Sequence, residues 1–222
     1  MKAISKWVLM LLPLLFAAGA SAEAATEEAT YKLLANEQPT ASADKVEVVE
    51  LFWYGCPHCH KLEPELQDWL AKKPDDVEFI RIPAILGPRW ELFAKAFYTS
   101  DLLDVTDKIH PALFAAIHED RKKIDTVDKV KAFFVDHGVS AEDFDKTFKS
   151  FAVAIKLNNA RMMTRRYGIS GVPTIIINGK YSTGPSMTGG NKQVIKVIDQ
   201  LIAQERKQLA VPSAPAAVSA SE

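Results

Sequence analysis

The sequence contains few cysteines and no excess of charge of either sign. Only two of its 222 residues are cysteines, so it cannot form a disulfide-dense scaffold or a zinc site with four thiolates. Its 27 basic and 28 acidic residues nearly balance. No nucleic-acid partner is therefore expected, because such proteins carry a strongly basic surface. Apolar residues make up 48% of the chain, which is typical of a globular protein and predicts one domain, with room for a large insertion.

The start of the chain has the pattern of a cleavable export signal. Lys2 and Lys6 precede an apolar run over residues 7–18, and the small residues 20–22 fit the small-x-small cleavage rule. The apolar run is shorter than the roughly 20 residues that a membrane-spanning helix needs. We therefore predict cleavage near Ala22 and export to a compartment in which disulfides persist.

Hydrophobic patterning predicts alternating strands and helices interrupted by a helical block. The expected elements are strands over 46–54, 77–82 and 174–177, a hairpin turn at Asn178-Gly179, and helices starting at Cys56 and Ser140 and spanning 90–103, 107–118, 126–137 and 192–209. In the helical stretch after Ser140, we expect Phe144, Phe148, Phe151 and Ile155 to face inward, on one long helix or on two. The lead-in before the first strand is expected to be loosely held.

The order of these elements predicts an α/β fold with a helical insertion, because a block of roughly 80 residues is too long for a simple connection. We divide the chain into a signal peptide (1–22), an N-terminal lead-in (23–44), a first α/β part with the cysteine motif (45–83), a helical insertion (84–167), a second α/β part (168–209) and a disordered tail (210–222).

The motif Cys56-Pro57-His58-Cys59 combines the only two cysteines at a predicted helix start. A cysteine in the first helical turn is close to unpaired N–H groups and to the positive end of the helix dipole, so the pKa of Cys56 should fall. His58 can donate to the same sulfur, and Pro57 fits a first turn because it lacks an N–H. We expect Cys56 to be the exposed, reacting sulfur and Cys59 to be its core-facing resolving partner.

Two segments resemble the DsbA-type thiol:disulfide oxidases of the thioredoxin superfamily. One is V-V-E-L-F-W-Y-G-C-P-H-C over residues 48–59, and the other is G-V-P-T-I-I-I-N-G-K-Y over residues 171–181. The resemblance covers roughly residues 45–209 and implies a thioredoxin-like fold with an inserted α-helical subdomain. It also implies that Pro173 is a cis-proline beside the sulfurs, and that the backbone of Val172 binds an extended substrate peptide by strand addition.

The resemblance further places Glu50 beneath the disulfide as a buried acid that tunes sulfur titration. Arg81 and Glu63 could complete a charge cluster there, while an ordinary surface ion pair is the alternative. We expect no organic cofactor and no metal, because the electrons reside on sulfur. The family implies unfolded exported proteins with free thiols as substrates, a membrane quinone reductase of the DsbB type as reoxidising partner, a periplasmic location and a monomer.

Three alternatives compete with a disulfide oxidase. Residues 56–60, C-P-H-C-H, satisfy the C-x-x-C-H rule for covalent haem attachment, although a strand leads into the motif and His60 reads as a solvent-facing helix residue. A metal site that uses both cysteines and a histidine such as His58, His60, His110 or His118 is short of ligands. A general reductase or isomerase is closer in chemistry. Reductases normally carry Gly-Pro between the cysteines, and the related isomerases carry Thr where this chain has Val172.

Overall fold

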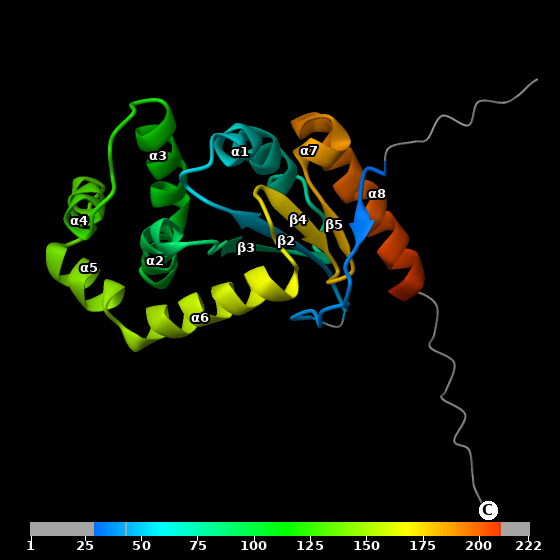
Figure 1. Cartoon of the computed structure of the whole chain (residues 1–222), viewed down its shortest axis with the longest axis horizontal. Coiled ribbons are helices and arrows are strands. Elements are labelled where there is room, and N and C mark those ends of the chain that lie inside the picture. Colours follow the sequence, from blue (N-terminus) through cyan, green and yellow to red (C-terminus); the bar gives the residue numbers. More distant parts are fainter. Residues whose placement is uncertain (1–28, 43, 210–222) are drawn as a thin grey trace, which may run out of the picture.

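The computed structural model describes residues 29–42 and 44–209, and Figure 1 shows their arrangement. The predicted signal peptide with its cleavage near Ala22 and the predicted disordered tail lie outside the described residues. Within the described part, no helix combines the length and apolar character needed to cross a membrane.

A five-stranded mixed sheet forms the centre of the fold, with the strand order β1-β5-β4-β2-β3. The strands are β1 (Lys32–Leu33), β2 (Val46–Phe52), β3 (Val77–Pro83), β4 (Thr174–Ile177) and β5 (Tyr181–Thr183). Every residue of β2 is buried, since this strand pairs with β3 in parallel and with β4 in antiparallel orientation. In this register Glu50 lies between Ile175 and Arg81, so one acid of the central strand faces one base of its neighbour.

The described residues form eight helices, and five of these make up the inserted subdomain between β3 and β4. The helices are α1 (Pro57–Leu70), α2 (Pro88–Leu102), α3 (Thr106–His118), α4 (Val127–Asp136), α5 (Ala141–Phe148), α6 (Phe151–Arg166), α7 (Pro185–Thr188) and α8 (Asn191–Leu209). Leu62 of α1 and Leu201 of α8 pack on one face of the sheet against Val48 and Ile177. In Figure 1, α2 to α6 lie beside the sheet, and α6 leads back to β4.

The stretch after Ser140 forms two helices, and the prediction that Phe151 and Ile155 face inward is wrong. Ser140 caps α5 as predicted, because its hydroxyl accepts the Asp143 N–H at 3.0 Å. A second cap at Ser150 then starts α6 and resets the helical register. Phe151 is consequently 81% exposed and Ile155 45% exposed, whereas Val153, Leu157 and Ala160 are buried.

The lead-in is held more firmly than the sequence predicts. Lys32 and Leu33 pair with β5, and the Leu34 N–H donates to the carbonyl of Lys180 at 2.7 Å. These partners belong to a hairpin almost 150 residues later, so no local pattern could reveal them. The hairpin itself is confirmed: Asn178 and Gly179 have φ values of 50° and 64°, as a tight turn between antiparallel strands requires.

Candidate functional site

The cysteine motif lies where the central strand ends and the first helix begins. Cys56 is the N-cap of α1, and its sulfur accepts the Cys59 N–H at 3.4 Å. Pro57 occupies the first helical turn, as expected. A hydrogen bond from the Cys59 thiol, together with the backbone N–H groups of Cys59 and His58 and the charge of His58, lowers the pKa of Cys56 to about 6, although partial burial opposes this. The strand-to-helix junction therefore makes Cys56 the more acidic thiol.

The two cysteines differ in acidity more than in exposure. Both are free thiols, and Cys59 is fully buried, as predicted. Burial raises the pKa of Cys59, so it stays protonated when Cys56 is a thiolate. Cys56 is only 7% exposed, which corrects the expectation of an exposed sulfur. Its cover comes partly from a distant segment, the loop around Val172.

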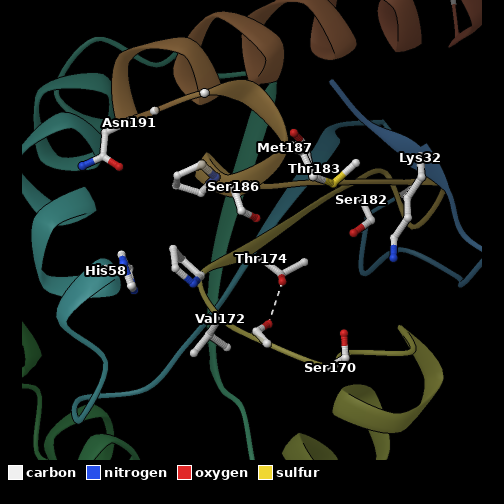
Figure 2. Close-up of a pocket in the computed structure, with 16 residues that line it drawn as sticks. Lys32, His58, Ser170, Val172, Thr174, Ser182, Thr183, Ser186, Met187 and Asn191 are labelled. Carbon is white, nitrogen blue, oxygen red and sulfur yellow. Dashed lines mark hydrogen bonds between the residues drawn. The ribbon is translucent and has the colours of Figure 1, made fainter. Parts of the chain in front are cut away.

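That loop places the backbone of Val172 against the reactive sulfur. The thiol of Cys56 donates to the carbonyl oxygen of Val172 at 3.4 Å, across 116 residues of sequence. The peptide bond between Val172 and Pro173 is cis, as the resemblance implies. The loop is further ordered by Thr174, whose hydroxyl donates to the Gly171 carbonyl at 2.8 Å (Figure 2). The cis-proline loop and the cysteine motif are therefore neighbours in space.

A groove of about 600 Å³ runs from the motif along this loop. His58 lines one end and Lys32 lines the other, with the cis-proline loop between them (Figure 2). The segment 182–191 supplies the opposite wall, mostly with small or hydroxyl-bearing residues. A groove with an open backbone edge and few bulky side chains can accept an extended peptide of varied sequence.

Glu50, Arg81 and Glu63 form a buried charge cluster and not a surface ion pair. The Arg81 Nε donates to Glu50 at 3.0 Å, and its terminal nitrogen donates to both oxygens of Glu63 at 3.1 and 3.2 Å. Glu50 is fully buried and Glu63 is 7% exposed. Burial raises the pKa of Glu50 to about 8, although the positive charge of Arg81 opposes this. The charge of Glu50 also reaches Cys59 and contributes to its raised pKa.

The cluster extends to His110 and Tyr54, which sequence reasoning did not connect to it. His110 Nε2 lies 2.9 Å from Glu63, and its Nδ1 lies 2.8 Å from the Tyr54 hydroxyl. Burial alone would raise the pKa of Glu63, but the His110 hydrogen bond and the charge of Arg81 lower it to about 2. One signal was available in the sequence, since His110 shares the buried face of its helix with Ile109 and Leu113.

His60 is not the solvent-facing residue that the sequence suggested. Its ring stacks on His118, with centroids 5.1 Å apart, and its Nε2 lies 3.2 Å from Glu119. His118 in turn hydrogen-bonds the Tyr54 carbonyl at 2.7 Å. His60 therefore contacts the C-terminal end of α3 and links α1, which carries the cysteine motif, to the helical subdomain.

Comparison with known proteins identifies the family. A family model described as a DSBA-like thioredoxin domain matches residues 80–201. The thiol:disulfide interchange protein DsbA of Azotobacter vinelandii is 40% identical over 197 residues, covering 86% of this chain and 92% of that protein. The DsbA protein of Pseudomonas syringae pv. tomato is 42% identical over 176 residues, covering 79% and 82% of the two chains.

The fold agrees with these sequence relationships. The crystal structure of Pseudomonas aeruginosa DsbA superposes with a TM-score of 0.78 at 38% identity, covering 81% of this chain and 93% of that one. The Azotobacter match is long enough to include both the cysteine motif and the cis-proline loop, although the family-model match begins after the motif. The chain therefore belongs to the DsbA family of thioredoxin-like thiol:disulfide oxidoreductases.

Proposed function

We propose that this protein oxidises pairs of thiols in exported proteins and works in the periplasm. The observation that carries the proposal is the unequal pair at the helix start, where the pKa of Cys56 is lowered to about 6 and that of Cys59 is raised. A stabilised Cys56 thiolate favours the reduced form of the protein. The disulfide form is consequently a strong acceptor of electrons from substrate thiols.

The reaction consists of two exchanges at sulfur. A substrate thiolate attacks Sγ of Cys56, the Cys56–Cys59 bond breaks, and Cys59 leaves and takes up a proton. The second substrate thiolate then attacks the substrate sulfur of this mixed disulfide and releases Cys56 as a thiolate. Two electrons pass from the substrate to the protein, and the substrate gains one disulfide. His58 and Pro57 act here by shaping the first turn around Cys56.

Substrate binding is assigned to the loop at Val172 and Pro173. Because the Val172 carbonyl already lies within 3.4 Å of Cys56, a peptide that pairs with this backbone would bring its cysteine to the reacting sulfur. Backbone pairing is tolerant of sequence, which suits an enzyme that must accept many unfolded chains. Glu50, Glu63 and Arg81 are assigned the tuning of sulfur acidity, because hydrogen bonds join them in one cluster and the charge of Glu50 contributes to the raised pKa of Cys59.

A membrane quinone reductase of the DsbB type is proposed to restore the disulfide, and the protein is proposed to act as a monomer. The protein itself needs no cofactor in these exchanges, since the sulfurs of Cys56 and Cys59 carry the electrons between substrate and reductase.

The decisive test uses a reduced, unfolded protein with several cysteines as substrate. Oxidised mature protein should convert substrate thiols to disulfides in stoichiometric amounts and should become reduced itself. The matched control is Cys56→Ser, which should form no substrate disulfides. If the wild-type protein leaves the substrate thiols reduced and instead reduces disulfides of an oxidised substrate in a glutathione buffer, the direction that we propose is wrong.

A further inference from the structure

The two buried carboxyl groups of the charge cluster receive very different numbers of hydrogen bonds. Glu63 accepts on both oxygens from Arg81, on Oε1 also from His110 at 2.9 Å, and on Oε2 also from Gln67 at 3.1 Å. Glu50 accepts a single bond, from Arg81 Nε at 3.0 Å. Its other oxygen is buried and has no partner among the described residues.

The hydrogen-bonding direction along His110 follows from its two neighbours. Tyr54 is fully buried, and burial raises the pKa of its hydroxyl, so Tyr54 keeps its proton and donates it to Nδ1. Nε2 faces a carboxylate oxygen and must therefore carry a hydrogen. Burial lowers the pKa of His110, which keeps the ring neutral. His110 is thus a neutral donor aimed at Glu63 from the helical subdomain.

One cation is shared by two acids in this cluster, so one of the acids must hold a proton to avoid an uncompensated buried charge. An ionised carboxylate is stabilised by donors, whereas a carboxyl oxygen without a donor is better suited to the neutral form. The titratable or charged side chains that face the cluster are Arg81 from β3, Glu63 and Cys59 from α1, Tyr54 from the junction, and His110 and Asp107 from α3.

We propose that His110 is a positioning residue that assigns the shared proton to Glu50 by holding Glu63 in its ionised form. This inference rests on the proposed function, because it explains how the sulfurs are kept free of a neighbouring buried anion. With Glu50 neutral, the negative charge of the cluster stays on Glu63, where Arg81 and His110 compensate it. A Cys56 thiolate is then easier to form, since no second negative charge opposes it.

The helical subdomain thereby takes part in tuning the redox centre. Its residue His110 is 47 positions from Glu63, and both its ring nitrogens are engaged with groups of the thioredoxin-like part. Removing the donor should let the proton move from Glu50 to Glu63, which would leave Glu50 as a buried anion whose charge acts on Cys59.

The test is an NMR pH titration of the glutamate side-chain carboxyl carbons in the reduced full-length mature protein. In the wild type, Glu50 should titrate near pH 8 and Glu63 far below neutrality. In His110→Phe, which retains an aromatic ring in the cluster, the midpoint of Glu50 should fall by at least about one unit and that of Glu63 should rise. His110→Gln, which retains an amide donor, should restore the wild-type order. His137→Phe is the matched control at a histidine outside the cluster.

A second readout is the thiolate titration of Cys56 in the same variants. Its midpoint should rise by about half a unit in His110→Phe, equivalent to a roughly threefold weaker stabilisation of the thiolate. The inference is overturned if Glu63 titrates above Glu50 in the wild type, a result that needs no variant to fold. It is also overturned if folded His110→Phe titrates as the wild type does. Failure of the proposed function would instead appear as a wild-type protein that does not oxidise substrate thiols.

Discussion

Two buried glutamates lie in different parts of the fold, one in the central strand near the redox motif and one on α8 against the β4–β5 hairpin, and their surroundings differ. At the redox end, Glu50 accepts a hydrogen bond from Arg81, and its charge acts on the thiol of Cys59. At the hairpin end, Glu205 of α8 accepts from Asn178 at 2.5 Å and from Lys180 at 2.8 Å. Both glutamates are fully buried, and each has one oxygen without a partner in the described part of the chain.

The difference lies in the neighbours of each carboxyl group. Arg81 donates hydrogen bonds to two acids, Glu50 and Glu63, so this cluster has one more acid than base. One of the two carboxyl groups therefore holds a proton. Lys180 forms an ion pair with Glu205 at 2.8 Å. The second acid near Lys180 is Glu37, which is exposed and lies 3.8 Å away. A cation shared by two buried acids leaves one of them to hold a proton, whereas Lys180 lies against Glu205 and links the hairpin to α8.

The largest effect is expected from the cysteines themselves, which exist only at the redox end. Cys56→Ser should abolish disulfide formation. Cys59→Ser cannot form the internal disulfide and should also fail to oxidise substrate, but its Cys56 thiolate should attack a disulfide of an oxidised substrate, release one substrate thiolate and remain as a mixed disulfide, because the resolving thiol is missing. The measurement is the thiol content of a reduced substrate, together with gel analysis of the trapped species. Glu205→Gln is the control from the hairpin end and should oxidise substrate at the wild-type rate. If Glu205→Gln oxidised substrate more slowly than the wild type, the hairpin end would also influence the redox reaction.

The acidity of Cys56 gives the next largest effect. Its pKa of about 6 predicts that about 90% of the reduced protein is thiolate at pH 7, compared with a few per cent for an ordinary cysteine. Since the pKa is lowered in the folded state, this stabilisation is full above the unfolded value of about 8.5 and is lost as the pH falls through 6. Ultraviolet absorbance of the thiolate measures the midpoint. A midpoint above 7, or one that persists in Cys56→Ser, would contradict the assignment.

Glu50→Gln should stabilise the protein at neutral pH. The pKa of Glu50 is raised to about 8, so the folded state holds a proton that the unfolded chain releases above about pH 4.3, and stability is lost between these values. Glutamine removes this cost, and we expect a gain of about 2 kcal/mol in the free energy of unfolding at pH 7. Denaturant unfolding of the wild type and of Glu50→Gln, at pH 4 and at pH 7, measures the difference in their free energies of unfolding. An equal effect at both pH values would show that titration is not its cause.

The same substitution at the hairpin end should have the opposite sign. Glu205→Gln weakens the charged hydrogen bonds to Lys180 and Asn178, and we expect a loss of about 1 kcal/mol. Denaturant unfolding at pH 7 measures it beside Glu50→Gln. If both variants lose stability to the same extent, the two carboxyl groups do not differ in the way that their neighbours suggest.

The smallest effect is expected at His60. His60→Gln removes the ring stack on His118 and the contact with Glu119, whose side chain is 64% exposed. Solvent-screened contacts of this kind are worth at most about 1 kcal/mol. The thiolate midpoint of Cys56 should change by less than half a unit. A larger change would show that His60, together with its contacts at the C-terminal end of α3, influences the acidity of Cys56.

Much of the fold was predictable because its signals are local. The strand predicted over 46–54, the cap at Ser140 and the turn at Asn178-Gly179 each depend on neighbouring residues, and each was confirmed, with the strand ending at Phe52. The faces of α6 were mispredicted at Phe151 and Ile155, because a second cap at Ser150 changed the register by a few residues.

Less of the site was predictable, because its geometry joins distant segments. The motif predicted an acidic Cys56 and a buried Cys59, since both properties follow from their positions on one helix. The low exposure of Cys56 was missed, since its cover includes a loop 116 residues away. The place of His110 in the charge cluster was missed for the same reason, as nothing near it in the sequence reveals its partner Glu63.

The sequence by itself determined the helix start at Cys56, the acids and bases available and the strand-helix order, because these depend on residue type and on spacing of a few positions. Only the tertiary structure decided that Arg81 is shared by two acids, that His110 favours one of them, and that Val172 lies against the reactive sulfur. Hydrogen bonds and burial act over a few ångströms in space, and the register of the sheet and the packing of α3 set which residues lie within that reach.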